Sequence, residues 1–215
     1  MPYRRTENVA RRLAAREKAI LDAAAALASE AGMAAVQITA VAARAGIAAG
    51  TVYRYFPSKT ELVAELVKAT AARELAAMKA AADAAPGPLS ALAACIARFA
   101  ARALAHRKLA WALIAEPVEP ELDPARRDFR RALAAEIGTR IATAIAHRLL
   151  PEQDAALGAA AIVGALMEGL VGPLAPVNET VSAREAVQGA TLLALRALGV
   201  VDARARGLVA QMVLA

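Results

Sequence analysis

Residues 39–62, TAVAARAGIAAGTVYRYFPSKTEL, restrict the possible folds more than any other part of this chain of 215 residues. Val41, Ala42 and Ala45 lie at positions i, i+1 and i+4, which places them on one apolar face of a short helix. Gly46 follows at the position where the end of a helix commonly turns left-handed. We therefore expect a short helix, a tight glycine turn and a second helix.

The second helix is expected over residues 49–55 and has two chemically different faces. Val52, Tyr55 and Phe56 can face a core, and Pro57 then ends the helix. The residues left at the outer face are small, hydroxylated, phenolic or cationic, namely Ala49, Gly50, Thr51, Tyr53 and Arg54. A structural protein could use the same turn, but it has little need for Thr, Tyr and Arg on a face that the core does not use. The pattern is typical of a helix-turn-helix, whose second helix enters the major groove of DNA.

The run AxxAGIxxGTVYRYFPSKxEL resembles the DNA-binding signature of the TetR/AcrR family of transcriptional regulators. The residues that carry this resemblance are Val41, Ala42, Ala45, Gly46, Ile47, Gly50, Thr51, Val52, Tyr53, Tyr55, Phe56, Lys59 and Leu62. The close resemblance covers about residues 15–65, and beyond them it is one of length and helical character only. It implies an all-α protein with an N-terminal three-helix DNA-binding domain that contains the helix-turn-helix. A larger helical domain for effector binding and dimerisation would follow.

Two positions depart from the family pattern. Gln37 stands where the family usually has Thr at the start of the first helix of the motif, and Ala48 stands where Ser or Thr usually opens the second. A side-chain oxygen that caps a helix at such a position contributes about 1 kcal/mol. Without it, the N–H groups stay available to water or to DNA phosphate oxygens, and no hydroxyl group at position 48 can contact a phosphate.

The composition favours helices throughout the chain. Hydrophobic residues make up 59% of the sequence, and many of them are alanine, whereas aromatic residues make up 3%. Ala, Leu, Arg and Glu favour helix, and no convincing alternating β pattern occurs. A chain of this length can bury the cores of one small and one larger domain. We place a helix-turn-helix domain at residues 9–68 behind a basic arm at 1–8, and a C-terminal ligand-binding and dimerisation domain at 69–215.

Further helices are expected at about residues 10–31, 58–84, 89–105, 107–116 and 124–149. The proline- and acid-rich segment 116–124, EPVEPELDP, is expected to be an exposed loop. Arg126, Arg127, Arg130 and Arg131 follow this loop. They could form a second anion site, or, as the simpler alternative, a solvated face of a helix.

The segment 155–177, AALGAAAIVGALMEGLVGPLAPV, contains one charged residue and is long enough to span a bilayer. Its many alanines and glycines, Glu168 and its two late prolines argue against a membrane helix. We expect instead a helix buried on nearly all sides, paired with a second one at about residues 182–198 in a dimer interface, as the family resemblance implies. The expected interface residues are Ala160, Gly164, Ala165, Gly169, Ala186, Gly189, Ala190, Leu193 and Ala197. The alternative is that these helices pack within one subunit.

Positive charge is concentrated near the N-terminus. The whole chain carries a net charge of +6, and residues 1–68 hold ten Lys or Arg against six Asp or Glu. A flexible basic arm before a helix-turn-helix suits a polyanion such as DNA, although a solvated tail is the alternative. The candidate DNA contacts are Arg4, Arg5, Gln37, Thr39, Arg44, Ala49, Gly50, Thr51, Tyr53, Arg54 and Lys59. Arg54 is the leading candidate for a base contact, because a guanidinium can pair bidentately with guanine. The resemblance implies that Lys59 meets the DNA backbone.

The resemblance also implies a repressor that binds a palindromic operator as a homodimer and is released by a small, largely apolar effector. The effector would occupy a cavity among residues 89–149 and 155–175. Candidate lining residues are Phe99, Trp111, Phe129 and Met167, with His106 or Glu116 as polar anchors, although each could equally be core or surface. The alternative is a nucleoid-type protein that binds DNA without sequence preference and without an effector, which leaves the long C-terminal part unexplained.

Other functions find little support in the sequence. His106 and His147 have no carboxylate at helical spacing, and no metal-ligand cluster, glycine-rich phosphate loop or nucleophile motif occurs. We therefore expect no enzyme, no cofactor and no metal site. The charged N-terminus has no apolar signal-peptide core. Cys95, the single cysteine, is expected to be a small core residue and fits a reducing cytoplasm, so we expect a cytoplasmic protein without a membrane partner.

Overall fold

The structure is a computed structural model that describes residues 3–114, 116, 120–176 and 181–212, and for residues 3–7 it describes the backbone alone. This described part of the chain consists of helices joined by turns, without a β-strand. The helices are α1 (Tyr3–Ala31), η1 (Met33–Ala35), α2 (Ile38–Arg44), α3 (Ala49–Tyr55), α4 (Lys59–Asp83), α5 (Pro88–Ala105), α6 (Arg107–Ile114), η2 (Pro120–Leu122), α7 (Asp123–Ala146), α8 (Ala155–Leu170), α9 (Ala183–Ala197) and α10 (Asp202–Ala210). The prediction of an all-α protein is confirmed.

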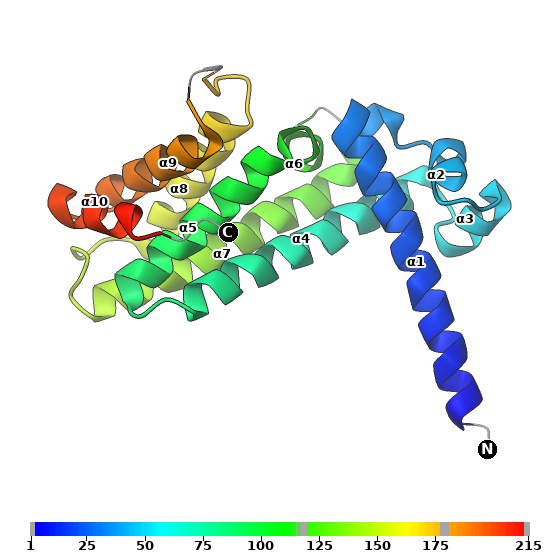
Figure 1. Cartoon of the computed structure of the whole chain (residues 1–215), viewed down its shortest axis with the longest axis horizontal. Helices are drawn as coiled ribbons and strands as arrows, with labels where there is room; N and C mark the ends of the chain where they lie inside the picture. The colour runs from blue at the N-terminus through cyan, green and yellow to red at the C-terminus, as the bar shows by residue number, and fades with distance from the viewer. Residues whose placement is uncertain (1–2, 115, 117–119, 177–180, 213–215) are drawn as a thin grey trace.

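Two helical units share the long helix α4 (Figure 1). Helices α1, α2 and α3 pack together with the start of α4, and α4 then continues into a bundle formed with α5 to α10. Helix α5 lies inside this bundle, where it packs against α4, α7 and α9. The larger unit is therefore joined to the smaller one by the continuous helix α4 and by α6, which packs on α1.

The core of the smaller unit is built from one apolar stripe of each helix. The buried residues of these stripes include Ile20, Ala24 and Ala28 of α1, Val41 and Ala42 of α2, Val52 of α3, Phe56 after α3, and Leu62 and Leu66 of α4. Fully burying a Val, Leu, Ile or Phe side chain contributes about 1.5–3 kcal/mol. The packing of these stripes therefore sets the orientation of α3 relative to α1 and α4.

Helix α1 begins earlier than the sequence predicts and projects beyond the core (Figure 1). We expected a helix from residue 10 behind a flexible arm, but α1 begins at Tyr3, so Arg4 and Arg5 lie in its first turns. The side chains of these two arginines are outside the described part of the chain. Residues 8–19 are exposed, and the helix meets the core only after them. The alanines and arginines of this stretch have high helix propensity, which explains why the arm is helical.

Two helices of the bundle, α5 and α8, are apolar enough to be compared with membrane-spanning helices. Helix α8 has 16 residues and ends at Leu170, so it is shorter than the segment 155–177 predicts and shorter than the roughly 20 residues that a bilayer needs. Among the described residues, α5 is the one helix that is long and apolar enough to cross a membrane, and 56% of it is buried inside the fold. Core helices of soluble proteins share these properties.

The segment 116–124, predicted to be an exposed loop, is only partly described. Residues 117–119 lie outside the described residues, and residues 120–122 form the short helix η2 rather than an irregular loop. Leu122 is buried and anchors this turn, whereas the neighbouring acidic side chains of Glu121 and Asp123 are exposed.

Cys95 lies in α5 and is fully buried. Burial raises the pKa of its thiol to about 12, and the negative charge of Glu136 acts in the same direction. Because the thiolate is the reactive form, we expect the folded protein to resist alkylation by iodoacetamide at about pH 8 and the unfolded protein, with an ordinary thiol pKa, to react fully. Mass spectrometry of both samples measures this difference, and rapid labelling of the folded protein would contradict the buried position of the thiol.

Candidate functional site

The turn between α2 and α3 has the left-handed glycine that the sequence predicts. Gly46 has a φ of +66°, a conformation that residues with a Cβ rarely adopt. Its N–H donates to the carbonyl of Ala43 at 3.2 Å, and the N–H of Ile47 donates to the carbonyl of Ala42 at 3.0 Å. These hydrogen bonds close the end of α2 and set the direction in which α3 leaves the turn.

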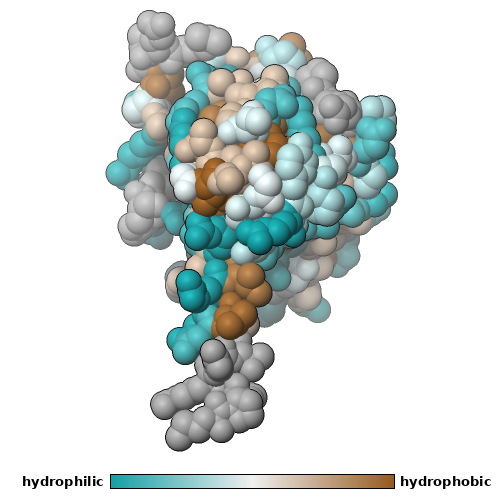
Figure 2. Space-filling view, turned by 90° about the vertical axis from the view of Figure 1, so that its right-hand side faces the viewer, coloured by the Kyte–Doolittle hydropathy of each residue, from teal (hydrophilic) through white to brown (hydrophobic). Residues whose placement is uncertain are grey.

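Helix α3 turns a polar face outward at the end of the molecule that Figure 2 views. Tyr53 is 52% exposed, and Gly50 and Arg54 are also exposed. Ala49 and Thr51 are half-buried at the edge of this face. Within the described part of the chain, Arg54 has no hydrogen-bond or ion-pair partner, so its guanidinium is available to an external acceptor.

A hollow of about 500 Å³ lies between α3 and the projecting part of α1. Val9, Arg12, Leu13 and Arg16 of α1 line one wall, and the glycine turn with α3, including Arg54, lines the other. Val9 and Leu13 are each 52% exposed, and Figure 2 shows apolar side chains among hydrophilic ones on this projecting helix. Three guanidinium groups therefore line a hollow beside the outer face of α3, and guanidinium groups pair well with phosphate.

The candidate DNA contacts beside α3 differ in their exposure and in the hydrogen bonds that they already make. Gln37 opens α2 without a capping hydrogen bond, and its amide donates to the carbonyl of Ala34 at 2.9 Å. Ala48 opens α3 and makes no side-chain cap either. Thr39 is exposed in the first turn of α2, and Lys59 is half-buried at the first position of α4. The expected absence of capping side chains at both helix starts is confirmed.

Arg44, a predicted DNA contact, is engaged within the protein. Its Nη1 and Nη2 donate to the two carboxylate oxygens of Glu30 at 2.7 and 2.6 Å. This hydrogen-bonded pair raises the pKa of Arg44 and lowers the pKa of Glu30. The pair ties α2 to the end of α1, so a DNA phosphate would have to compete with Glu30 for this guanidinium.

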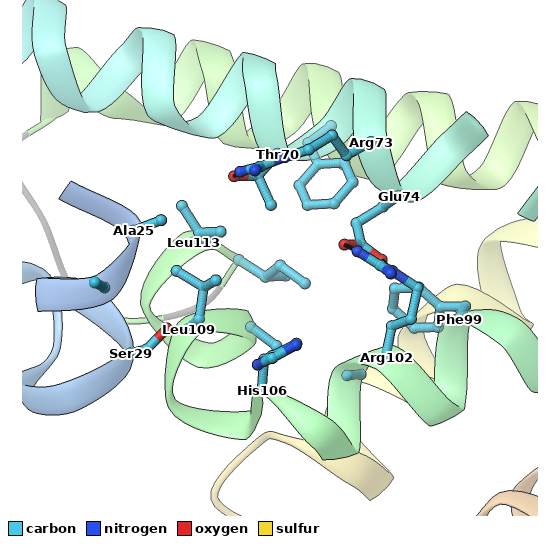
Figure 3. A pocket seen from close by; sticks show the side chains of 15 residues that line it. Ala25, Ser29, Thr70, Arg73, Glu74, Phe99, Arg102, His106, Leu109 and Leu113 are labelled. Carbon is cyan, nitrogen blue, oxygen red and sulfur yellow. Dashed lines mark hydrogen bonds and ion pairs between the residues drawn. The ribbon is translucent and has the colours of Figure 1, made fainter. Parts of the chain in front are cut away.

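An inner cavity of about 240 Å³ lies where α1, α4, α5, α6 and α7 meet (Figure 3). Its lining residues are Ala25, Ala26, Ser29, Thr70, Arg73, Glu74, Phe99, Arg102, Ala103, His106, Leu109, Ala110, Leu113, Ile114 and Phe129. The cavity therefore borders both helical units, because α1 belongs to the smaller unit and α5 to α7 belong to the larger one.

This cavity differs from the one that we expected. The expected contacts that border it are Phe99, His106 and Phe129, and the expected contacts that do not are Trp111, Glu116 and Met167. The segment 155–175 contributes nothing to its wall, and α1 takes that place. The mismatch arises because α6 packs across α1 rather than against α8.

An ion pair in the cavity wall was not predicted from the sequence. Nε and Nη2 of Arg102 donate to the carboxylate oxygens of Glu74 at 2.6 and 2.7 Å, and the hydrogen bonding raises the pKa of Arg102. In Figure 3 the two side chains meet at one side of the cavity, and Ala25 and Ser29 lie at the other. The two charged residues are 28 positions apart in the sequence, so no local spacing could have paired them.

Glu116 joins the end of the α6 region to the smaller unit. Its carboxylate accepts the N–H of Met33 in η1 at 2.9 Å. A Cβ at Gly32, which has a φ of +78°, would lie 3.2 Å from the same carboxylate. On the other side, the guanidinium of Arg126 donates to the carbonyls of Glu116 and Ala112. Glu116 therefore stands between α7 and the start of the helix-turn-helix and does not face the cavity.

Arg126 does not belong to the solvated arginine face that we expected on α7. It is 4% exposed, and burial lowers its pKa, whereas Arg127, Arg130 and Arg131 are exposed. Because an alanine at position 126 would remove the donor to the buried carbonyl of Ala112 and to the partly buried carbonyl of Glu116, we expect it to lower the free energy of unfolding by about 2–3 kcal/mol. Thermal or urea unfolding measures this loss. Arg127→Ala is the control, with an expected change in the free energy of unfolding within about 0.5 kcal/mol. Equal losses in the two variants would contradict the role of Arg126 as the donor to these two carbonyls.

The predicted interface residues lie on the outer surface of α8 and α9. The exposed ones are Ala160, Gly164, Ala165, Gly169, Gly189, Leu193 and Ala197, and the half-buried ones are Ala186 and Ala190. A Cβ added at Gly164, Gly169 or Gly189 would meet no atom within 4 Å. Leu157 and Leu193 are 68% and 61% exposed. Helix α8 is therefore not buried on nearly all sides within the chain.

The histidines form no reactive cluster in the described part of the chain. His106 is exposed at the cavity, and the exposed His147 places its Nδ1 2.9 Å from the carbonyl of Thr143. Among the described residues, no group of three or more His, Cys, Asp and Glu side chains is arranged to hold a metal ion.

Comparison with known proteins identifies the smaller unit. Residues 20–66 match the family of bacterial regulatory proteins described as the tetR family. Over 48 residues the chain is 62% identical to the HTH-type transcriptional repressor KstR of Rhodococcus jostii strain RHA1, a match that covers 22% of this chain and 23% of KstR. The matched segment thus spans less than a quarter of the length of the curated relatives.

Solved structures extend the likeness to most of the chain. A TetR-like transcriptional regulator from Rhodococcus sp. RHA1 is 26% identical, with a TM-score of 0.64 over 85% of this chain and 95% of that one. The transcriptional regulator FadR from Bacillus subtilis, solved in complex with stearoyl-CoA, is 19% identical and shares the fold, with a TM-score of 0.72 over 86% of this chain and 98% of FadR. The fold and the helix-turn-helix thus define a helical regulatory protein. Residues 20–66 thus form a helix-turn-helix domain of the tetR type, and most of the chain shares the fold of TetR-like transcriptional regulators.

Proposed function

We propose that the chain is a ligand-responsive repressor that binds a palindromic DNA operator as a homodimer. The observation that carries this proposal is the outer face of α3, where Tyr53 is exposed and Arg54 has no partner within the described part of the chain. The turn at Gly46 and the buried Val52 hold this face outward. Side chains on such a helix can reach base edges in the major groove.

Each residue of the outer face has a proposed role. Arg54 reads a guanine or binds a phosphate, because its guanidinium can donate two parallel hydrogen bonds. Thr51 and Tyr53 contact phosphate or sugar oxygens and so set the register of α3 on the duplex. Gly50 allows the helix to approach closely, and Ala49 can touch the methyl group of a thymine.

The surroundings of α3 add contacts to the DNA backbone. Gln37 and Thr39, beside the start of α2, are proposed as flanking contacts, and Arg44 joins them only if it exchanges Glu30 for a phosphate. The basic turns of α1 extend this surface along the duplex, and Arg4 and Arg5 lie at their far end. Such contacts raise affinity for every DNA sequence and make it depend on salt.

Lys59 is proposed to bind a backbone phosphate from the start of α4. We expect Lys59→Ala to weaken binding to all DNA sequences alike and to reduce the slope of log affinity against log salt by about one unit per subunit. Fluorescence anisotropy titrations at several salt concentrations measure both effects. Lys68→Ala, which removes an exposed cation from the same helix, is the control, and an equal loss of slope there would contradict a specific role for Lys59.

The homodimer is proposed to form through the outer face of α8 and α9. The glycines of this face leave room for another helix to approach, and Leu157 and Leu193 are large apolar side chains exposed to water. Burying apolar surface contributes about 25 cal/mol per Å². A two-fold axis through this face would relate two copies of α3, as two half-sites about 34–36 Å apart require.

The effector is proposed to occupy the inner cavity and to act through α6. Leu109, Ala110 and Leu113 of α6 line the cavity on one side, and α1 lines it on the other. A shift of α6 would reach the helix-turn-helix through Glu116, whose carboxylate holds the N–H of Met33. A ligand that favours one position of α6 would thereby change the separation of the two α3 helices and release the DNA.

The first test of this proposal is anisotropy of the full chain on the DNA upstream of its own gene. We expect tight, salt-sensitive binding with two subunits per site, and much weaker binding to scrambled DNA of equal length. Equal binding to both DNAs, repeated on other genomic fragments, would favour a nucleoid-type protein without sequence preference. Failure to bind any DNA would contradict the proposal.

A further inference from the structure

The wall of the inner cavity combines buried apolar side chains with charged and polar ones. Phe99, Leu113, Ile114 and Phe129 line it and are buried, with exposures of 4%, 1%, 4% and 4%. The polar side chains of the wall are Ser29, Thr70, Arg73, Glu74, Arg102 and His106. Figure 3 shows these groups arranged around one shared space, with contributions from α1, α4, α5 and α6. A ligand that fills this space must therefore be amphipathic.

The guanidinium groups of the wall are ion-paired but keep unused hydrogen-bond donors. Glu74 is the one carboxylate among the lining residues, and it is already bound side-on by Nε and Nη2 of Arg102. Nη1 of Arg102 has no acceptor within the described part of the chain, so its N–H groups remain available. Arg73 adds a second guanidinium, which forms an ion pair with Asp22 at 3.4 Å and donates to the hydroxyl of Thr70 at 3.3 Å. His106 adds a ring without a hydrogen-bond partner among the described residues.

The volume limits the size of the ligand. A cavity of about 240 Å³ has room for on the order of eight to twelve nonhydrogen atoms, because a water molecule occupies about 30 Å³ of liquid. A single aromatic ring or a short branched chain with one polar group fits this limit.

We infer that the cavity binds a compact monocarboxylate, whose carboxylate lies between Arg102, Arg73 and His106 and whose apolar body packs against Phe99 and Phe129. This inference rests on the proposed function, since it names the chemical class of the effector. A carboxylate accepts two or more charge-assisted hydrogen bonds, and the guanidinium N–H groups that the two ion pairs leave unused can donate them. The aromatic rings supply the apolar surface that the rest of the ligand needs.

The position of the cavity gives this ligand direct access to the DNA-binding unit. Ala25, Ala26 and Ser29 of α1 form part of its wall, and α1 continues from there into the core that holds α3. The ligand therefore touches the smaller and the larger unit at once. Its binding changes the packing between α1 and α6 without a longer relay through the bundle.

The test uses the full chain and three acids, benzoate, phenylacetate and hexanoate, each paired with its neutral amide. Calorimetry and thermal unfolding measure binding, and anisotropy measures release of bound DNA. We expect at least one acid to bind once per subunit, at least about tenfold more tightly than its amide, and to release the DNA. Equal binding of each acid and its amide, or no binding of any acid at about 10 mM, would overturn the inference.

Two cavity variants and one control test whether the acid binds in this cavity, and they distinguish failure of this inference from failure of the proposed function. Arg102→Gln should remove the preference for acid over amide, and Ala110→Leu should fill the cavity and weaken acid and amide alike. Arg98→Gln, one turn earlier on α5 and outside this cavity, is the matched control and should bind like the parent. Unchanged acid binding in both cavity variants would overturn the inference. A protein that binds operator DNA but no acid contradicts only this inference, whereas one that binds an acid without selective DNA binding contradicts the proposed function.

Discussion

Replacing Arg54 with alanine is expected to lower affinity for the operator by about 30-fold to 10⁴-fold and to relax the preference for its sequence. A bidentate contact between a guanidinium and guanine contributes about 1–3 kcal/mol, and a homodimer loses it in both half-sites. The side chain is exposed and has no partner within the described part of the chain, so its loss should not affect folding. Anisotropy titrations on the operator and on single-base variants measure both effects.

Arg54→Lys distinguishes a base contact from a phosphate contact. A lysine keeps the charge but cannot form the planar pair of hydrogen bonds, so it should restore affinity for all sequences without restoring the sequence preference. Full recovery of specificity with lysine, or an unchanged preference with alanine, would contradict the proposed base contact. The melting temperature of each variant serves as the control for folding.

Replacing Gly164 with arginine is expected to convert the homodimer into monomers and to abolish operator binding at concentrations that saturate the parent. A Cβ at this position meets no atom of its own chain within 4 Å, so the arginine can be accommodated in the subunit. In the proposed interface, however, the same side chain would place a bulky charge between two closely packed helices, which costs several kcal/mol unless it is paired. Sedimentation velocity measures the oligomeric state, and anisotropy measures the DNA binding.

Gly207→Arg is the matched control for this variant. Gly207 lies on α10, is exposed, and likewise has no atom within 4 Å of an added Cβ. The same substitution there should leave a dimer that binds DNA like the parent. A Gly164→Arg protein that remains dimeric would show that the subunits meet elsewhere.

The helix-turn-helix could be predicted from the sequence because its determinants are local. The apolar positions of α2, the left-handed Gly46 and the exposed face of α3 lie within one short segment, so spacing alone indicates their arrangement. The start of α1 differs from the prediction, because a cluster of charges does not by itself distinguish a flexible arm from an exposed helix. The alanines between those charges favour a helix, and they extend it to Tyr3.

The cavity and the inter-unit contacts could not be predicted in the same way. Glu116 and Met33 are separated by 83 positions, and no short-range pattern brings them together. The burial of Arg126 did leave a signal in the sequence. It lies three residues before Phe129 and seven before Leu133, both buried, so it shares the apolar stripe of α7 rather than its polar face.

Hydroxyl-radical footprinting of the full chain on the DNA fragment that it binds most tightly tests the central claim, that two copies of α3 enter successive major grooves of one palindromic site. The expected result is two protected segments related by two-fold symmetry, with centres about 10 bp apart, and loss of both in Gly164→Arg. A single protected segment, or uniform protection that does not follow the sequence, would contradict the dimeric repressor.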